Sequence, residues 1–118
     1  MEVTPSQFDL MRQMMGASHL RHQVVSHNLA NINTPGYHRK DVDFEGRLGE
    51  LLRAGDSSVN ELTPRVFEVE GLPERADGNN VDVDREIGQL NKNALLYQTW
   101  SQILASRVSM MRSAIDGR

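Results

Sequence analysis

Two histidines, His19 and His22, have the spacing that comes nearest to metal chemistry in this chain, because side chains three residues apart share one face of a helix. Protein zinc sites combine His with Cys, Asp or Glu ligands, and hydrolytic sites place a glutamate general base between two histidines. The chain has no cysteine, and no glutamate lies between these histidines. We therefore expect no metal site and no bound cofactor, and a metal-dependent enzyme using His19 and His22 is only the third hypothesis.

Four oxygen-bearing side chains in the second half, Asp77, Asn79, Asp82 and Asp84, resemble the ligands of a calcium loop. Such a loop needs a glycine after its third ligand and a bidentate glutamate at its end. The glycine is missing and Glu86 comes too early. The spacing excludes this type of calcium site.

A second group of carboxylates, Asp41, Asp43 and Glu45, lies beside a turn and lacks an apolar pocket that would shift its protonation. We interpret it as a solvated face. Serine, threonine and tyrosine occur without a motif that would activate a nucleophile. The sequence predicts no enzyme.

Charge is distributed unevenly along the 118 residues, whose net charge is −3. Residues 1–40 carry four Lys and Arg against two Asp and Glu, residues 41–86 carry five against thirteen, and residues 87–118 carry four against one. The run His38-Arg39-Lys40 is the single basic cluster, and we expect a solvated corner there rather than nucleic-acid binding. No cleavable signal peptide is recognisable and no run is long enough to span a membrane.

A long helix is predicted near the N-terminus, capped by Thr4 with Pro5 in the first helical position and Gln7 completing a capping box, and continuing to about Asn33. Its first stripe alternates spacings of three and four and consists of Phe8, Met11, Met15, Ser18, His22, Val25, Leu29 and Ile32. A second stripe consists of Leu10, Met14, Ala17, Leu20 and Val24. Two adjacent stripes predict a helix that is buried on more than one side.

The last helix is predicted from Val83, with Asp82 or Asp84 as its cap. Its coiled-coil seam consists of Val83, Ile87, Leu90, Ala94, Tyr97, Ser101, Leu104, Val108, Met111 and Ile115. The two long helices carry few charges for surfaces that meet water, so we expect neighbouring protein chains to surround them. A lone hairpin would leave half of each helix unpacked.

The residues between the long helices form an acidic connector over residues 38–80. A short helix is expected over Val42 to Arg53 and a brief strand over Val66 to Val69. Residues 54–80 are too poor in apolar side chains to fold alone, so a glycine such as Gly55 is expected to sit in backbone that can relax. The fold class is mostly α, with two long terminal helices packed as an antiparallel hairpin and a short irregular connector carrying the small helix and the strand.

The first helix ends in a motif that stops it abruptly. Thr34 precedes proline and avoids the α region, and Pro35-Gly36 fits the central positions of a type II turn that ends at Tyr37. The string resembles the Ala-Asn-x-x-Thr-Pro-Gly-Tyr motif of the axial proteins of the bacterial flagellum, that is, rod, hook and hook-associated proteins. Its expected assembly motif is Asn28, Ala30, Asn31, Thr34, Pro35, Gly36 and Tyr37.

Further similarity to flagellar basal-body rod proteins lies in the second half of the chain. It covers Gly78-Asn79-Asn80-Val81-Asp82 leading into Glu86, then Asn93-Ala94-Leu95-Leu96-Tyr97 and Ser113-Ala114-Ile115. The short middle leaves no room for the outer domain of hook and distal rod proteins, so the proximal rod proteins are the better comparison.

The resemblance implies a structural subunit of the proximal rod, the drive shaft that transmits torque across the periplasm. Residues 1–37 and 81–118 would form one axial helical domain, with residues 38–80 as a flexible connector. Implied partners are copies of itself, other rod proteins, the rod-to-ring adaptor and the flagellar type III export apparatus, with neither nucleic acid nor a membrane span involved. The helix-packing residues would be Phe8, Met11, Met15, Val25, Leu29, Ile87, Leu90, Ala94, Tyr97, Leu104, Val108, Met111 and Ile115. The alternative is a helical-hairpin adaptor or secretion chaperone, which should be a charged, stable dimer.

Overall fold

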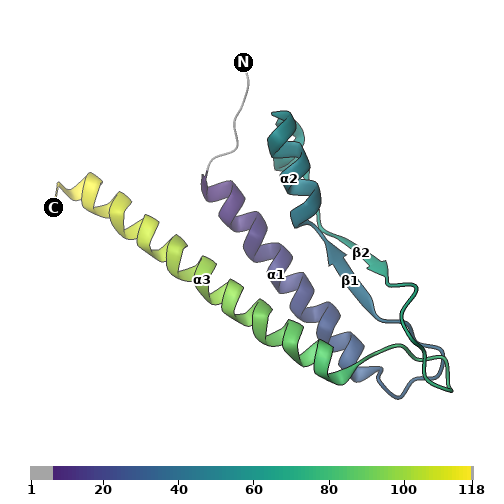
Figure 1. The fold of residues 1–118 in the computed structure, drawn as a ribbon. Coiled ribbons are helices and arrows are strands. Elements are labelled where there is room, and N and C mark those ends of the chain that lie inside the picture. Colours follow the sequence, from purple (N-terminus) through teal and green to yellow (C-terminus); the bar gives the residue numbers. More distant parts are fainter. Residues whose placement is uncertain (1–6, 118) are drawn as a thin grey trace.

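The computed structural model describes residues 7–117. Its elements are α1 (Gln7–Ala30), β1 (Lys40–Asp43), α2 (Glu45–Ala54), the 3-10 helix η1 (Ser57–Glu61), β2 (Arg65–Glu68) and α3 (Val83–Asp116). The chain is mostly helical, and the two long helices α1 and α3 pack together, as the sequence predicted (Figure 1). The expected cap at Thr4 and Pro5 lies outside the described residues.

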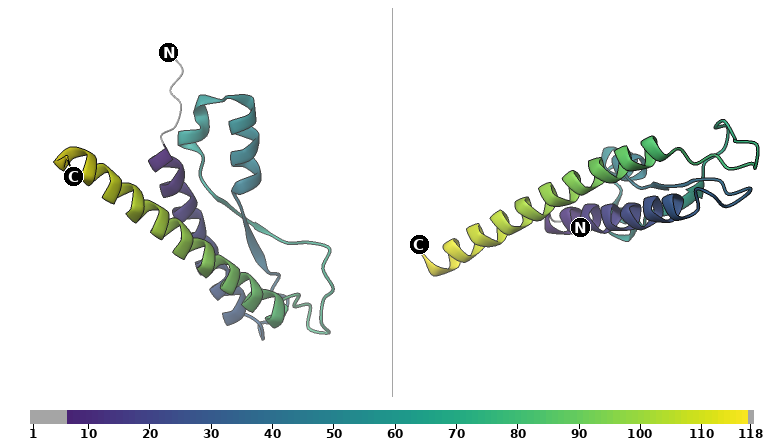
Figure 2. Two further views of the ribbon diagram at one scale, coloured as in Figure 1. Left: turned by 60° about the vertical axis from the view of Figure 1, so that its left-hand side comes forward. Right: turned by 90° about the horizontal axis from the view of Figure 1, so that it is seen from below.

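The long helices run in opposite directions and differ in length. Asn28 bonds to Glu86 near the turn, and Asn93 bonds to Ser18 farther from it. Residue numbers therefore fall along α1 as they rise along α3, so the two helices are antiparallel. At about 1.5 Å per residue, the 24 residues of α1 span about 36 Å and the 34 residues of α3 about 51 Å. The C-terminal turns of α3 therefore extend past the described part of α1 (Figure 2).

The first helix ends at Ala30, three residues before the predicted end. The Asn31 N–H still donates to the His27 carbonyl at 3.1 Å, and the Asn31 side chain donates to the same oxygen at 2.8 Å. The next bonds, from Ile32 to Leu29 and from Thr34 to Asn31, span three residues instead of four, as is common where a helix ends. The predicted turn follows: the Tyr37 N–H donates to the Thr34 carbonyl at 3.2 Å, and Gly36 has φ of +73°. These values confirm a turn with glycine in its left-handed position.

The connector contains more regular structure than the sequence indicated. The predicted helix over residues 42–53 begins only at Glu45, because Asp41-Val42-Asp43-Phe44 alternates with strand periodicity and buries Val42 and Phe44. β1 pairs with β2 in antiparallel register, with Val42 opposite Val66. The predicted strand is thus present one residue earlier, and its partner strand was not anticipated.

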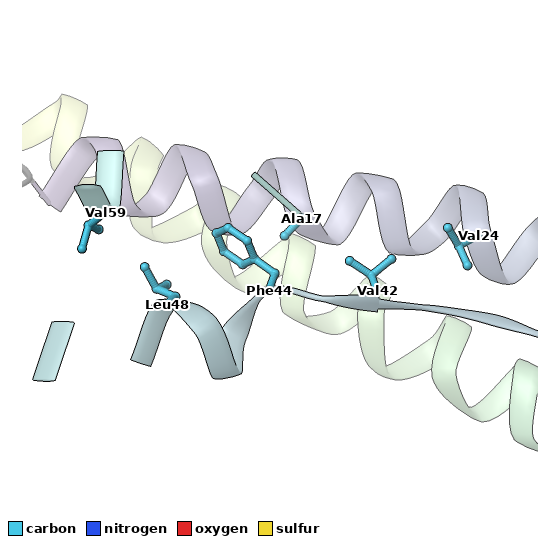
Figure 3. Packing of buried hydrophobic residues seen from close by; sticks show 6 residues of the cluster. All are labelled: Ala17, Val24, Val42, Phe44, Leu48 and Val59. Carbon is cyan, nitrogen blue, oxygen red and sulfur yellow. The ribbon is translucent and has the colours of Figure 1, made fainter. Parts of the chain in front are cut away.

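The hydrophobic core lies between α1 and the connector rather than between the two long helices. It consists of Ala17, Val24, Val42, Phe44, Leu48 and Val59 (Figure 3). Leu10, Met14 and Leu20 pack against it, so the second stripe of α1 is covered by β1, α2 and η1. The expectation that a hairpin leaves half of each helix unpacked is therefore wrong for α1.

An ion pair fixes α2 against α1, and a glycine closes the C-terminal end of α2. Arg21 on α1 donates from both terminal nitrogens to the Glu45 carboxylate, each at 2.6 Å, and this hydrogen bond raises the pKa of Arg21 and lowers the pKa of Glu45. At the other end of α2, Gly55 adopts φ of +66° and closes the helix through its N–H. The expectation that Gly55 lies in backbone that can relax is wrong.

A matched pair of leucines in α2 tests whether the connector carries the core. Leu48 is buried and Leu52 is 45% exposed. Leu48→Ala should lower the free energy of unfolding by about 2–5 kcal/mol, whereas Leu52→Ala should change it by less than about 0.5 kcal/mol. Urea denaturation of both variants measures this, and equally small effects would contradict a packed connector.

Candidate assembly site

The turn after α1 is held by a set of buried polar residues, Asn28, Tyr37, Arg39, Asn79, Asn80 and Glu86, which we call the turn network. Five of these six side chains are at most 6% exposed, and Tyr37 is half-buried. Buried polar groups need partners, because an unpaired donor or acceptor costs about 1–3 kcal/mol.

Asn28 is fully buried and satisfies all four hydrogen-bonding positions of its carboxamide. Its nitrogen donates to the Lys40 carbonyl at 2.8 Å and to Glu86 at 3.1 Å. Its oxygen accepts from the Lys40 N–H at 2.9 Å and from the Tyr37 hydroxyl at 3.0 Å. By bonding both backbone groups of Lys40, the amide takes the place of a neighbouring strand along the outer edge of β1.

Glu86 and Arg39 form an ion pair at the centre of the network. The Arg39 Nε donates to Glu86 at 2.5 Å, and the two side chains are 4% and 0% exposed. Asp41 lies 3.5 Å from the same guanidinium. Removing one partner of such a pair leaves a buried charge and typically costs about 3–5 kcal/mol.

The Tyr37 hydroxyl stays a hydrogen-bond donor in this environment. Burial raises the pKa of Tyr37, and the negative charges of Glu86 and Glu68 raise it further. The hydroxyl is therefore protonated at neutral pH and donates to Asn28. The aromatic residue that ends the turn is thus linked directly to α1.

Two consecutive asparagines bind the turn to the segment before α3. The Asn79 amide donates to the carbonyls of Asn31 and Thr34, both at 2.9 Å. The Asn80 oxygen accepts from the Arg39 N–H at 2.6 Å, and its nitrogen donates to Val69. The two segments of chain that leave α1 and enter α3 are fastened to each other by side-chain amides.

Two glycines meet where these segments cross. The Gly36 N–H donates to the Asp77 carbonyl at 2.8 Å. A Cβ placed on Gly78, which has φ of +83°, would lie 3.4 Å from the Gly36 Cα. Gly78 is therefore required by its backbone conformation, and a Cβ there would make an ordinary van der Waals contact with the Gly36 backbone.

Arg75 provides a further link. Its guanidinium donates to the Val81 carbonyl at 2.6 Å and to the carbonyl of Ile32. It thereby connects the loop before α3 to the residues after α1.

The predicted motif residues divide into two groups. Asn28 and Tyr37 belong to the network, and Asn31 and Thr34 contribute carbonyl oxygens to it. Ala30 and Pro35 are exposed, and Gly36 supplies the turn conformation.

Sequence reasoning missed the charged centre of the network. Arg39 was expected at a solvated corner, and that expectation is wrong because its side chain is buried against Glu86. Glu86 was considered as a misplaced calcium ligand and as part of the similarity to rod proteins, not as the partner of Arg39. The polar residues at positions 86 and 93 of α3 sit one heptad apart, which is the signal that a polar stripe faces α1.

The packing residues predicted on α1 and α3 differ in burial. Met11 and Val25 are buried, and Phe8, Met15 and Leu29 are half-buried on the same helix. On α3, Leu90 and Leu104 are half-buried, and the remaining predicted positions are exposed: Ile87, Ala94, Tyr97, Val108, Met111 and Ile115. The face of α3 that meets α1 is instead marked by Glu86 and by Asn93, which donates to the Ser18 carbonyl at 2.6 Å.

The described part of the chain offers neither a metal site nor a membrane span. Within residues 7–117, no group of three or more His, Cys, Asp or Glu side chains could hold a metal ion. Among the same residues, neither of the long helices nor the shorter ones is apolar enough over a sufficient length to cross a bilayer.

The chain is similar over most of its length to known flagellar proteins. The chain is 27% identical to the flagellar basal body rod protein FlgB of Escherichia coli K12, over 81% of this chain and 83% of that protein. It is 28% identical to FlgB of Aeromonas hydrophila, over 93% of this chain and 92% of that protein, and 28% identical to FlgB of Borrelia hermsii, over 89% and 92%. No family model matches the chain.

These relatives support a structural protein of the bacterial flagellar basal body and flagellar motility. Within that class, the chain is similar to FlgB rod proteins over most of its length. The names of the relatives describe rod components and not enzymes.

Two asparagines of the same motif allow a matched test of the turn network. Asn28 makes four buried or part-buried hydrogen bonds, whereas the Asn31 side chain makes only two, both exposed, to the His27 carbonyl and the Thr34 hydroxyl. We expect Asn28→Ala to lower the free energy of unfolding by about 3 kcal/mol, because several buried or part-buried groups lose their partner, and Asn31→Ala by less than about 1 kcal/mol. Denaturant titration followed by circular dichroism measures both, and similar losses would show that the network does not control stability.

The glycine crossing can be tested with Gly71 as a control, since Gly71 also has positive φ, +80°, but no atom lies within 4 Å of the position that its Cβ would take. Gly78→Ala and Gly71→Ala carry the same backbone strain, of about 1 kcal/mol. Gly78→Ala should cost about as much as Gly71→Ala, because its methyl group would lie 3.4 Å from the Gly36 Cα, an ordinary van der Waals distance. Thermal unfolding of the two variants gives the comparison, and a markedly lower midpoint for Gly78→Ala would show that the crossing has no room for a methyl group.

Proposed function

We propose that this protein is a structural subunit of the flagellar proximal rod, which assembles with copies of itself and with other rod subunits to transmit torque across the periplasm. The observation that carries the proposal is the long apolar stripe left uncovered on α3. The similarity to FlgB proteins supports the same function.

The uncovered stripe is extensive for a small protein. Exposed large apolar side chains on α3 are Val83, Ile87, Leu95, Leu96, Tyr97, Ile103, Val108, Met110, Met111 and Ile115. Ile115 is 82% exposed. From residue 94 to the end of α3, the charged residues are Arg107, Arg112 and Asp116. Uncovered apolar surface of this extent marks an interaction site.

The shape of the groove between the long helices supports packing of a further helix. Met15 on α1 and Leu104 and Val108 on α3 line an open groove of about 430 Å³ where the two helices diverge. The heptad spacing of Leu104, Val108, Met111 and Ile115 continues beyond that groove along α3. We propose that neighbouring subunits occupy this stripe and that the methionines adapt to unequal partners.

The two long helices and the turn would act as one assembly unit, covering residues 1–37 and 81–118. The proposed assembly residues are those of the motif from Asn28 to Tyr37 together with the apolar stripe. Residues 38–80 would brace α1 on the side opposite the partner subunits, because their apolar side chains belong to the core. α1 is thereby held in place while α3 remains available.

The proposed partners are other rod components, the rod-to-ring adaptor and the flagellar type III export apparatus, which would deliver the chain to the periplasmic rod without a cleaved signal peptide. The composition of the subunit is compatible with export as an unfolded chain. The 118 residues contain no cysteine that could form a disulfide, and the core is modest.

Ile115→Asp tests the stripe, with Gln102→Asp as its control on another side of α3, where the neighbouring residues are small or polar. Thirteen residues separate the two positions, which places them about 140° apart around the helix, and both are exposed. Both variants should fold like the parent chain, but Ile115→Asp should abolish rod assembly and motility, because burying an unpaired carboxylate costs several kcal/mol. Motility, purified rods and secreted subunit are scored in a strain lacking the native subunit. Normal rods with Ile115→Asp would place the interface elsewhere.

A further inference from the structure

The two outer edges of the β-hairpin differ in whether their backbone groups have hydrogen-bond partners. On β1, the outward backbone groups of Lys40 are bonded by Asn28, so α1 closes that edge. Just after β2, the Val69 N–H donates to the Arg39 carbonyl. This bond determines which backbone groups of β2 point toward β1 and which point outward. In the observed register, Phe67 faces β1 with its backbone groups, and Val66 and Glu68 direct theirs outward.

The outward edge of β2 has no partner within residues 7–117. No hydrogen bond reaches the outward backbone groups of Val66 or Glu68 from any described residue. The side chains of this strand are exposed as well, Val66 to 42% and Phe67 to 39%. Such an edge can accept another extended strand.

An apolar groove lies beside this edge. It has a volume of about 570 Å³ and is lined by Leu20 and Val24 of α1 and by Val66 of β2. Its polar lining includes His22, His27 and Lys40 and contains no carboxylate. The groove and the free edge together fit a strand that brings an apolar side chain and an acidic one.

We propose that the partner at this edge is β2 of a second copy of this chain, paired antiparallel. Because only Val66 and Glu68 direct backbone groups outward, the register that bonds all four of these groups places Val66 opposite the partner's Glu68. The alternative with Glu68 opposite itself brings like charges together. The alternative with Val66 opposite itself uses only one pair of outward groups.

The selected register has two further consequences. Phe67 meets its symmetry mate at the centre of the pairing, as an aromatic cross-strand pair. The partner's Glu68 arrives on the face that carries Val66 and Lys40, beside a groove whose ionisable groups are His22, His27 and Lys40. The charge of the arriving side chain complements that lining.

This contact is isologous, so it closes on two copies and cannot by itself extend a filament. It describes the subunit before assembly and is independent of the rod function. With four backbone hydrogen bonds and a small area, the dimer should be weak, with a dissociation constant on the order of 100 μM.

The test uses a proline that removes only an outward N–H. Val66→Pro deletes the donor at the free edge and leaves the bonds to β1 intact, because the Val66 backbone does not face β1. Val66→Ala is the control, since it shortens the side chain but keeps the N–H. Both are made in the full chain carrying Ile115→Asp, so that contacts through α3 do not obscure the result.

Sedimentation velocity from about 10 to about 500 μM, a range that brackets the expected dissociation constant, should show a concentration-dependent dimer for the parent and for Val66→Ala. Val66→Pro should form a dimer that is weaker by at least about tenfold, because the pairing loses backbone hydrogen bonds. Circular dichroism and the fluorescence of Trp100 check the fold of each variant.

An NMR dilution series of the parent supplies a readout that needs no proline: the amides of Val66 and Glu68 should shift with concentration while the Phe67 amide shifts less. A parent chain that stays monomeric to the top of the concentration range would overturn the proposal. A folded Val66→Pro variant that dimerises as well as Val66→Ala would overturn it too.

Discussion

The requirement that buried polar groups be paired governs the turn end of this molecule. The Asn28 side chain is buried on α1, and its amide finds hydrogen-bond partners only if β1 runs beside it and Glu86 of α3 lies within bonding distance. Glu86 in turn needs Arg39, which closely follows the turn. Each partner comes from a different segment, so one set of bonds fixes the exit from α1, the start of the hairpin and the entry into α3. An apolar cluster of the same size would bring these segments together without fixing their relative positions.

The different roles of the two long helices follow from this arrangement. Because β1 must run along α1 to reach Asn28, the connector covers the second stripe of α1 with Val42, Phe44 and Leu48. The same geometry turns a partly polar face of α3 toward α1, through Glu86 and Asn93. Val108, Met111 and Ile115 continue this face at heptad spacing, but there α3 diverges from α1 and extends past its described part (Figure 2). These apolar residues are therefore exposed because the two helices separate.

Local chemistry made much of the fold predictable from the sequence. The Pro35-Gly36 turn, the start of α3 at Val83 with Asp82 as its cap, and the pairing of two long helices all follow from residue types at short spacing. The two stripes of α1 were also predicted, although not which partner covers each one. The charged centre could not be predicted, because a heptad pattern does not distinguish Glu86 facing inward from Ile87 facing inward. That choice depends on Arg39, which lies 47 positions away.

The two ends of the helical pair consequently differ in how their contacts are satisfied. Near the turn, the segments are joined by directional bonds between partners in the same chain, so this end can hold its geometry in a single subunit. Toward the C-terminus of α3, Val108, Met111 and Ile115 have no comparable cover from the described residues, and apolar contact is tolerant of the partner's identity. Isolated helices of this kind are marginal in water and gain most of their stability from packing. In a subunit built in this way, bonds within the chain hold the turn end. The C-terminal end of α3 is left to be stabilised by the helices that pack against it.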